Sequence, residues 1–172
     1  RQRQMCIRDR ALYMAVTGRP GPVWLDIPLD VQGAVIETEN LRAYDPTENP
    51  EQKPQEISQE IIEKILDKIE ESHRPVLSPG NGVRLAGAIG EFHELVELLG
   101  VPVVTGMSSV DALESDHPYF AGRSGGTGTR AGNFALQNSD VLLSIGNRQG
   151  FAQTGFQYQD WARESYTILN DI

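Results

Sequence analysis

Three groups of glycines could carry binding chemistry, because a residue without a Cβ lets a main-chain N–H approach a phosphate closely. The groups are Gly80 with Gly82, then Gly122, Gly125, Gly126 and Gly128, and finally Gly146. Asn147 and Arg148 follow the last of them and would add an amide and a forked cation that suits phosphate or carboxylate. Helix N-termini that follow such turns also favour negative charge. The pattern therefore suggests a crevice for a nucleotide or a dinucleotide.

Each of these signals also has a plainer structural explanation. The glycines can be tight turns of an α/β domain. The turn at residues 80–82 keeps only two glycines of the dinucleotide fingerprint, because Leu85 stands where the third belongs. Arg148 can be a surface salt bridge, and Arg19, on a turn made rigid by prolines, has the same two interpretations. Spacing alone leaves these alternatives open.

The sequence shows no catalytic or metal-binding constellation. None of its histidines has a Cys or His neighbour at metal-ligand spacing, which favours structural roles for all of them. They are His73, His93 and His117. The carboxylates within residues 111–116 form an acidic loop, whose default state is solvated. We also find no activated-serine elbow and no Walker loop. We therefore predict neither a catalytic residue nor a metal ligand.

Buried strands must position the glycine groups. Residues 141–145 form a short, nearly continuous apolar run, which is typical of a strand buried on both faces of a parallel sheet. Similar reasoning predicts strands at 75–78, 101–105 and 166–170, helices at 57–71, 85–99 and 129–138, and irregular loops at 106–128 and 149–159. Strands that alternate with helices predict a doubly wound, mostly parallel α/β sheet. All three glycine groups would then lie at the carboxyl edge of that sheet.

The first third of the chain has a different pattern. Residues 11–16 resemble the end of a helix closed by Gly18, and residues 23–27 read as a strand after a proline turn. This piece is too small to bury a core alone, so we expect it to be the tail of a larger domain. Residues 37–56 are Pro-rich and acidic and have no core face, which is typical of a linker at a domain boundary.

The two ends of the chain carry expectations of their own. Residues 1–10 show neither helical nor strand periodicity. We interpret them as a non-native segment, similar to translated sequencing adapter, with a frayed basic arm as the alternative. At the other end the chain stops directly after a predicted strand, so we expect a domain that is truncated there.

Composition limits the class of protein. With 172 residues, of which 39% are hydrophobic, the chain can bury one ordinary core. The net charge of -9, without a dense Lys/Arg cluster, argues against a nucleic-acid partner. The single Cys6 rules out an internal disulfide framework and fits a reducing compartment. We see no membrane-spanning run and no secretory signal, so we expect a cytoplasmic protein without a membrane partner.

Residues 18–31, which read GRPGPVWLDIPLDV, carry a family likeness. They resemble the end of the pyrimidine-binding domain of thiamine-diphosphate enzymes of the acetolactate synthase group, which reads close to GRPGPVLVDIPKDV. The remainder is similar to the central domain of that family, a Rossmann-like (DHS-like) unit of six strands. Its matching pieces are residues 99–105, 116–118, 122–128, 138–148 and 171–172. After the non-native segment expected at 1–10, the resemblance implies a pyrimidine-domain tail at 11–36, a linker at 37–56 and a truncated central domain at 57–172.

The resemblance implies an activity for the full-length protein. It would decarboxylate a 2-oxo acid such as pyruvate on thiamine diphosphate, with Mg²⁺, and transfer the acyl unit to an acceptor, as a homodimer or homotetramer. In the family, the glutamate that activates the cofactor lies upstream of the position of Ala11, and the Gly-Asp-Gly motif for diphosphate and Mg²⁺ lies downstream of Ile172. The chain alone would therefore be inactive. The alternative is a non-catalytic, Rossmann-like nucleotide-binding module.

The central domain of acetolactate synthases also binds FAD, and the same crevice holds ADP or nothing in other branches. Carried over by position, the contacts would fall on Arg19, Gly80, Asn81, Gly82, Gly106, Met107, Ser124, Gly125, Gly126, Thr127, Gly146, Asn147, Arg148, Asp171 and Ile172. Two departures stand out. Residues 149–153 read QGFAQ where FAD-binding members carry Phe-Asp-Asp-Arg, and Leu29 replaces a lysine near the substrate channel. FAD, ADP and an empty crevice therefore all stay open.

Overall fold

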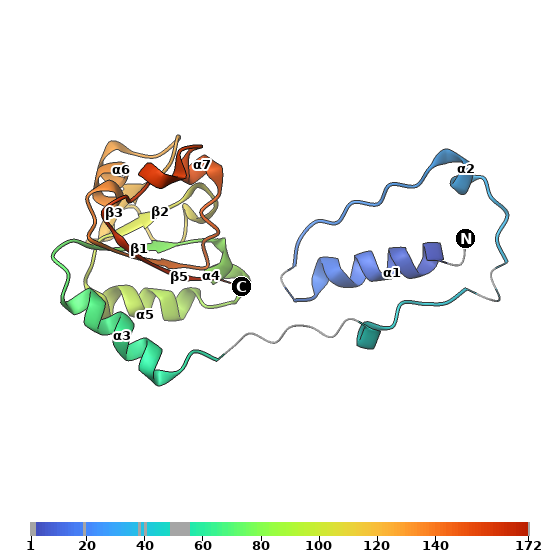
Figure 1. The fold of residues 1–172 in the computed structure, drawn as a ribbon, viewed down its shortest axis with the longest axis horizontal. Coiled ribbons are helices and arrows are strands. Elements are labelled where there is room, and N and C mark those ends of the chain that lie inside the picture. Colours follow the sequence, from blue (N-terminus) through green and yellow to red (C-terminus); the bar gives the residue numbers. More distant parts are fainter. Residues whose placement is uncertain (1–2, 19, 38, 40, 49–55, 172) are drawn as a thin grey trace. The chain divides into compact units, whose positions relative to one another are not determined.

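The computed structural model of the protein describes residues 3–18, 20–37, 39, 41–48 and 56–171 (Figure 1). The chain splits into two compact units, Arg1–Gln55 and Glu56–Ile172, each of which is considered by itself. Within these described ranges, no helix combines the length and the apolar character needed to cross a membrane.

The first unit contains helix α1 (Arg3–Val16), helix α2 (Leu29–Gln32) and the 3-10 turn η2 (Pro46–Glu48). Residues 3–10 are helical even without an apolar stripe, since straight-chain Gln, Arg and Met residues favour a helix; their interpretation as a non-native segment stays a prediction. One expectation was wrong here. Residues 23–27 form no strand, and Trp24 within them is 91% exposed. A strand needs a neighbour that takes up its hydrogen bonds, and no described segment supplies one.

The second unit is built on a five-stranded sheet in the order β3-β2-β1-β4-β5. Every pair of neighbouring strands is parallel, so the predicted doubly wound α/β fold is confirmed. The strands are β1 (Pro75–Pro79), β2 (Val103–Thr105), β3 (Phe120–Arg123), β4 (Val141–Ile145) and β5 (Tyr166–Asn170). The chain adds strands on one side of β1 and then returns to its other side with β4, which makes the β1/β4 boundary the topological switch point.

Strand β3 lies inside the stretch that we expected to be an irregular loop. It is short and half-buried and it contains Gly122, so its sequence lacks the apolar run that marks the central strands. Glycines serve close packing here. A Cβ on Gly122 would collide with the Thr129 side chain, and a Cβ on Gly132 would collide with the main chain of Arg123. Helix α6 (Arg130–Gln137) therefore rests almost directly on β3.

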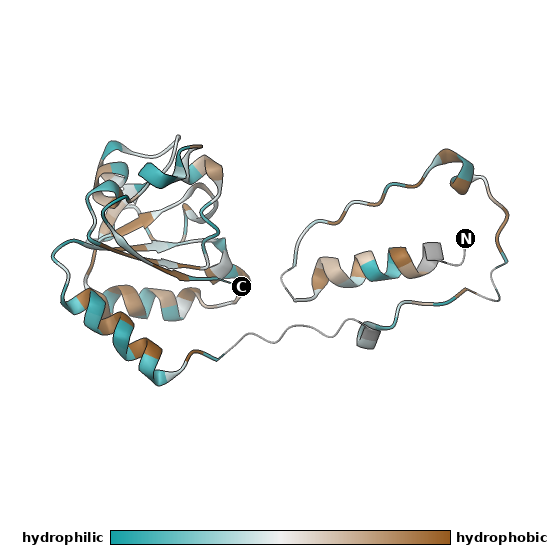
Figure 2. Ribbon diagram, viewed as in Figure 1, coloured by the Kyte–Doolittle hydropathy of each residue, from teal (hydrophilic) through white to brown (hydrophobic). Residues whose placement is uncertain are grey.

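Helices cover both faces of the sheet (Figure 1). On one face α3 (Gln59–Glu70) and α5 (Ile89–Leu99) pack onto a core that includes Leu77, Val96 and Val103. On the other face α6 packs onto a second core that includes Leu142. In Figure 2 the ribbons of these helices carry both hydrophobic and hydrophilic residues, as expected for helices with one apolar side.

Two helix boundaries differ from the expected ones. The predicted helix at 85–99 is divided into α4 (Asn81–Leu85) and α5 by Gly87, whose φ of +71 interrupts the helical path. The glycine turn at residues 80–82 is therefore the start of α4. Short helical turns also occur inside the predicted loops: η3 (Met107–Ser109), α7 (Phe151–Thr154) and η4 (Tyr158–Asp160). Gly100 ends α5 with a φ of +60, as expected.

Asp140 joins the amino ends of β1 and β4. Its carboxylate accepts hydrogen bonds from the main-chain N–H groups of His73 and Arg74, each at 2.8 Å. Burial alone would raise the pKa of Asp140, and these hydrogen bonds outweigh that effect, so the pKa lies below its ordinary value of 3.8. The Arg74 side chain also donates to the carbonyl of Asn138 at 2.7 Å.

Candidate functional site

The structure brings most of the predicted binding residues to one edge of the sheet. Gly80 follows β1, Gly106 follows β2, Ser124 follows β3, Gly146 follows β4 and Asp171 follows β5. Because all the strands are parallel, these positions share the carboxyl edge, where ligands of such sheets bind. Arg19 and Ile172 lie outside the described residues.

At the switch point, glycines allow two main chains to meet. The N–H of Gly80 donates to the carbonyl of Ile145, and the N–H of Gly82 donates to the carbonyl of Gly146, both at 2.8 Å. A Cβ on Gly82 would lie 2.7 Å from the Cα of Gly146, closer than real Cβ contacts come. Close packing between the α4 turn and the end of β4 therefore accounts for the glycine at residue 82.

The main-chain N–H of Gly146, one of the glycines expected to approach a phosphate, already has a partner within the sheet. Its N–H donates to the carbonyl of Asn170 at 2.7 Å, which continues the β4/β5 ladder. This hydrogen bond could not be predicted from the sequence, because its acceptor lies on a separate strand. Whether Gly146 also contacts a nucleotide stays a prediction.

The two side chains after Gly146 behave differently. Asn147 Nδ2 donates to Ser78 Oγ at 3.3 Å, and Asn147 Oδ1 accepts from the N–H of Gln149 at 3.0 Å. These bonds hold the turn and support a φ of +51 at Gln149, which is uncommon for a residue other than glycine. Arg148 is exposed, and it forms no ion pair with any other residue that the structure describes. Its guanidinium is available to an anion.

Helix α7 covers the glycines that follow β2 and β3. A Cβ on Gly106 would lie 2.8 Å from Gln153 Oε1, and a Cβ on Gly125 would lie 2.8 Å from the carbonyl oxygen of Ala152. The N–H of Gly126 donates to that same carbonyl at 3.3 Å. The N–H groups of Gly106 and Gly125 are also engaged, by Ser109 Oγ at 3.0 Å and Asn133 Oδ1 at 2.9 Å.

In this conformation the β2/β3 end of the carboxyl edge is closed to the phosphates of FAD, the cofactor that the family resemblance implies for this edge. The main-chain donors expected to receive its phosphates are hydrogen-bonded within the protein, and Ala152 and Gln153 fill the space above Gly106 and Gly125. The β2/β3 end of the edge therefore offers a dinucleotide neither free main-chain donors at Gly106 and Gly125 nor open space above them.

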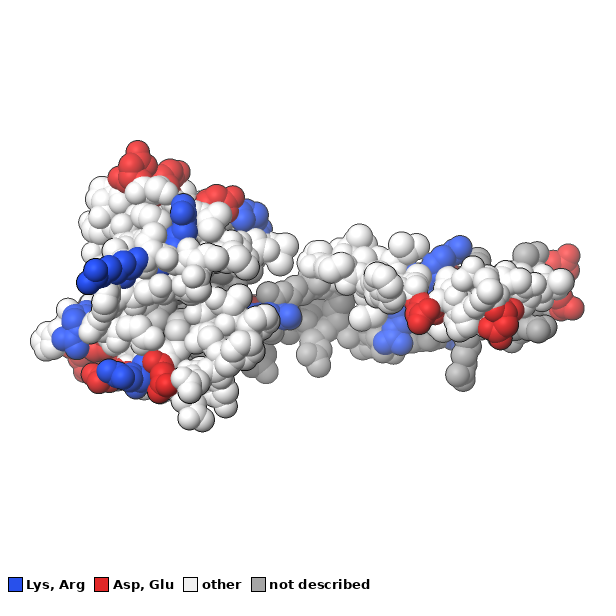
Figure 3. Space-filling model, turned by 90° about the horizontal axis from the view of Figure 1, so that it is seen from above, with Lys and Arg blue, Asp and Glu red and all other residues white. Residues whose placement is uncertain are grey.

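The histidines make structural contacts. His93 Nε2 lies 2.9 Å from the carbonyl oxygen of Ala112, and His117 Nε2 lies 2.9 Å from Glu97 Oε1. Across the part of the chain that the structure describes, no three His, Cys, Asp or Glu side chains gather as metal ligands would. Figure 3 shows basic and acidic side chains interspersed on the face in view, without a dense basic patch over the second unit.

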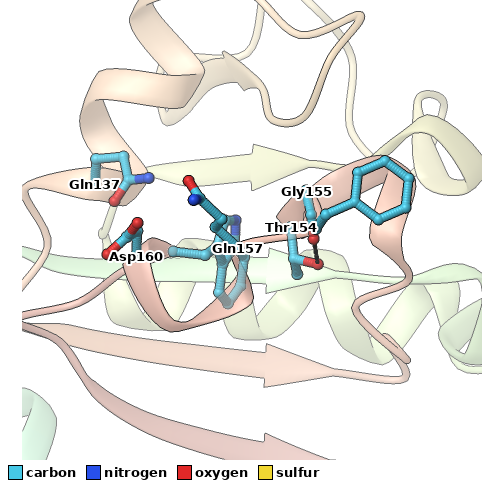
Figure 4. A pocket seen from close by; sticks show the side chains of 7 residues that line it. Gln137, Thr154, Gly155, Gln157 and Asp160 are labelled. Atoms are coloured by element: carbon cyan, nitrogen blue, oxygen red, sulfur yellow. Dashed lines mark hydrogen bonds between the residues drawn. The ribbon is translucent and has the colours of Figure 1, made fainter.

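One surface depression was missed by the sequence reasoning. It has a volume of about 560 Å³ and an open mouth (Figure 4). Its lining consists of Gln137, Thr154, Gly155, Phe156, Gln157, Asp160 and Trp161. Gln137 uses its Oε1 to accept from the N–H of Ala162 at 3.0 Å. The unusual density of aromatic residues within 151–161, a stretch interpreted only as a loop, was the available signal.

Comparison with known proteins identifies the family. Residues 62–172 match the family described as thiamine pyrophosphate enzyme, central domain, and this match covers more than half of the chain. The chain therefore belongs to the thiamine pyrophosphate enzyme central-domain family, as the resemblance predicted.

Relatives within this family to which the chain is similar include acetolactate synthase large subunits. The probable acetolactate synthase large subunit of Methanocaldococcus jannaschii is 38% identical, over 94% of this chain and 27% of the relative. The acetolactate synthase large subunit of Corynebacterium glutamicum is 37% identical, over 94% of this chain and 25% of the relative. For the acetolactate synthase isozyme 2 large subunit of Escherichia coli the values are 33%, 96% and 29%. The chain thus spans little more than a quarter of the length of these relatives.

Proposed function

We propose that this chain is part of a thiamine-diphosphate-dependent enzyme of the acetolactate synthase type. The enzyme would decarboxylate a 2-oxo acid such as pyruvate and pass the acyl unit to an acceptor. The family match over residues 62–172 carries the proposal, and the names of the relatives support it. Thiamine diphosphate, when bound, supplies the electron sink for decarboxylation. We propose that the cofactor and Mg²⁺ are held by residues outside this chain, so the chain alone is inactive.

The proposed role of this chain is to build the central domain and its carboxyl edge. The sheet fixes the turns after its five strands relative to one another, and Arg148 stands exposed beside the switch point. We propose that this edge takes a nucleotide, FAD or ADP, with Arg148 as the partner of a phosphate. The exposure of Arg148 and the lack of an ion pair to it among the described residues support this assignment.

The activity is tested on the protein expressed from its complete reading frame. Pyruvate consumption and acetolactate formation are measured with thiamine diphosphate and Mg²⁺, and then after removal of the metal with EDTA. We expect acetolactate to form and EDTA to abolish its formation. Pyruvate turnover without acetolactate would retain the cofactor class and require another acceptor. A protein that leaves pyruvate untouched would instead favour the non-catalytic nucleotide-binding module.

Nucleotide binding is tested on the 172-residue chain by titration with FAD and with ADP, followed by flavin fluorescence and calorimetry. Arg148→Ala should weaken binding about tenfold, because it removes a charge-assisted contact to phosphate. Arg163→Ala is the matched control, since Arg163 is exposed and lies next to Glu164, away from the proposed contacts. Equal losses in both variants would remove Arg148 from the site.

We further propose that the complete enzyme works in the cytoplasm as a homodimer or a homotetramer. Sedimentation of the full-length protein distinguishes these two states, and a monomer that is fully active would contradict the proposal.

A further inference from the structure

Helix α7 is a short segment between two glycines. Gly150 precedes it, with no atom within 4 Å of the position that a Cβ would take, and Gly155 follows it with a φ of +76, in a region that favours glycine. The outer side of this segment is exposed to solvent. Phe151 is 70% exposed, and its ring stacks on that of Phe156 with the ring centroids 5.6 Å apart. We call residues 149–155 the α7 strap.

The strap is weakly held where it covers the carboxyl edge. Its main-chain contact to the β3 turn is the hydrogen bond from the N–H of Gly126 to the carbonyl of Ala152, which at 3.3 Å is long. The Nε2 atoms of Gln149 and Gln153 are buried, and neither has a hydrogen-bond partner in the described part of the protein. A buried donor without a partner is costly, so the closed position of the strap leaves polar groups unsatisfied.

We propose that the α7 strap is a built-in cover that closes the nucleotide crevice in the free protein and opens when a nucleotide binds. This inference rests on the proposed nucleotide site. Opening would uncover Gly125 and release three donors, namely the N–H of Gly126 and the carboxamides of Gln149 and Gln153. Arg148 directly precedes the strap and adds a positive charge.

The chemistry of these groups selects the ligand. The donors suit the oxygens of a phosphate, and the strap itself carries no acidic residue that would repel one. The ligand class is therefore a phosphate-bearing nucleotide, and its apparent affinity is reduced by the fraction of time that the strap is closed.

A reversible cross-link tests the cover. Gly126→Cys and Ala152→Cys are introduced into the 172-residue chain with Cys6→Ser, so that the new pair holds the only two thiols. The hydrogen bond from Gly126 to Ala152 places the two main chains side by side, and a Cβ on Gly126 displaces nothing within 4 Å. The two Cβ atoms therefore lie more than 4 Å apart, so a small shift closes the disulfide, and titration of free thiols verifies that it has formed. Oxidation locks the strap and dithiothreitol frees it, so each preparation is its own control.

FAD and ADP are titrated into both redox forms. We expect the oxidised form to bind the nucleotide at least about tenfold more weakly than the reduced form, because the disulfide removes the open conformation of the strap that binds it. The single Gly126→Cys variant should bind equally with and without dithiothreitol. Equal affinity in the oxidised and reduced forms would overturn the proposal. The proposal would also be overturned if neither the reduced form nor the wild-type chain bound a nucleotide. The proposed enzyme activity is tested separately, by the pyruvate assay of the full-length protein.

Hydrogen exchange on the wild-type chain gives a second readout that needs no cysteine. The N–H of Gly126 is hydrogen-bonded only while the strap is closed, and the N–H groups of Gln153 and Gly155 are hydrogen-bonded only while helix α7 is intact. Saturating nucleotide should speed exchange at Gly126 and in the strap while leaving β4 unchanged. Added protection throughout the strap would show that the ligand binds with the cover in place.

Discussion

Substitution of Gly82 by alanine tests the close approach at the switch point. The main chain of α4 meets the end of β4 here, and an added Cβ would lie 2.7 Å from both the Cα and the carbonyl oxygen of Gly146 and 3.0 Å from its carbonyl carbon. All three neighbours are main-chain atoms, so no side chain can rotate away. The two segments must separate, which also weakens the 2.8 Å hydrogen bond from Gly82 to Gly146.

The magnitude follows from three terms, two that destabilise and one that stabilises. Overpacking of this kind costs about 1–3 kcal/mol, and loss of one main-chain hydrogen bond adds about 1 kcal/mol. Replacement of glycine by alanine in a helix returns about 1 kcal/mol. We therefore expect the free energy of unfolding to fall by about 1–3 kcal/mol, which corresponds to a melting temperature roughly 5–15 °C lower for a unit of this size.

Thermal and urea unfolding followed by circular dichroism measure the effect. Gly90→Ala is the matched control, because Gly90 lies in α5 with nothing within 4 Å of its Cβ position. That variant should be stabilised by about 0.5–1 kcal/mol. If Gly82→Ala melts at or above the wild-type temperature, the two turns do not pack as described and the reasoning fails.

Three other perturbations have expected outcomes. The pKa of Asp140 is lowered in the folded state, so its contribution to stability is present above the unfolded pKa and is lost as the pH falls below about 3.8. In urea unfolding at a series of pH values, the free energy of unfolding of Asp140→Asn should therefore fall less steeply in acid than that of the wild type. Thr129→Ala removes the hydroxyl that accepts from the N–H groups of Gly132 and Arg123 and should cost about 1–2 kcal/mol in urea, whereas the exposed Thr127→Ala should cost little. Leu169 is 62% exposed on the edge strand β5, so we expect the chain to associate through this edge, and Leu169→Lys should lower concentration-dependent light scattering more than Thr167→Lys. A Leu169 variant that associates like wild type would place the contact elsewhere.

The sheet could be predicted where strands are buried on both faces. The apolar runs of β1, β2 and β4 follow from burial alone, and alternation with helices then gives the parallel order and its carboxyl edge. Strand β3 was not predicted, because it is an edge strand that is only partly buried and its sequence, which includes Gly122, has no apolar run. The strand expected at residues 23–27 shows the opposite error, since local propensity cannot supply a pairing partner.

The candidate site was predictable in position and only partly in chemistry. Topology alone gathers the turns after the strands at one edge. The hydrogen bonds that occupy the glycine amides depend on acceptors such as the carbonyls of Ile145 and Asn170, which approach only in the folded sheet. The cover provided by Ala152 and Gln153 was equally hidden, because a four-residue helix leaves no periodic pattern.

The β1/β4 boundary has a consequence for the order of folding. β1 pairs with β2, and β4 pairs with β5, across separations less than half of that between Pro75 and Val141, which lie 66 positions apart. Closing the longer loop costs more chain entropy, so the two halves of the sheet should form before they join. Contacts across the boundary would then be largely absent from the transition state. Gly82→Ala should accordingly speed unfolding far more than it slows folding, which makes this boundary the part of the domain that governs how long it stays folded.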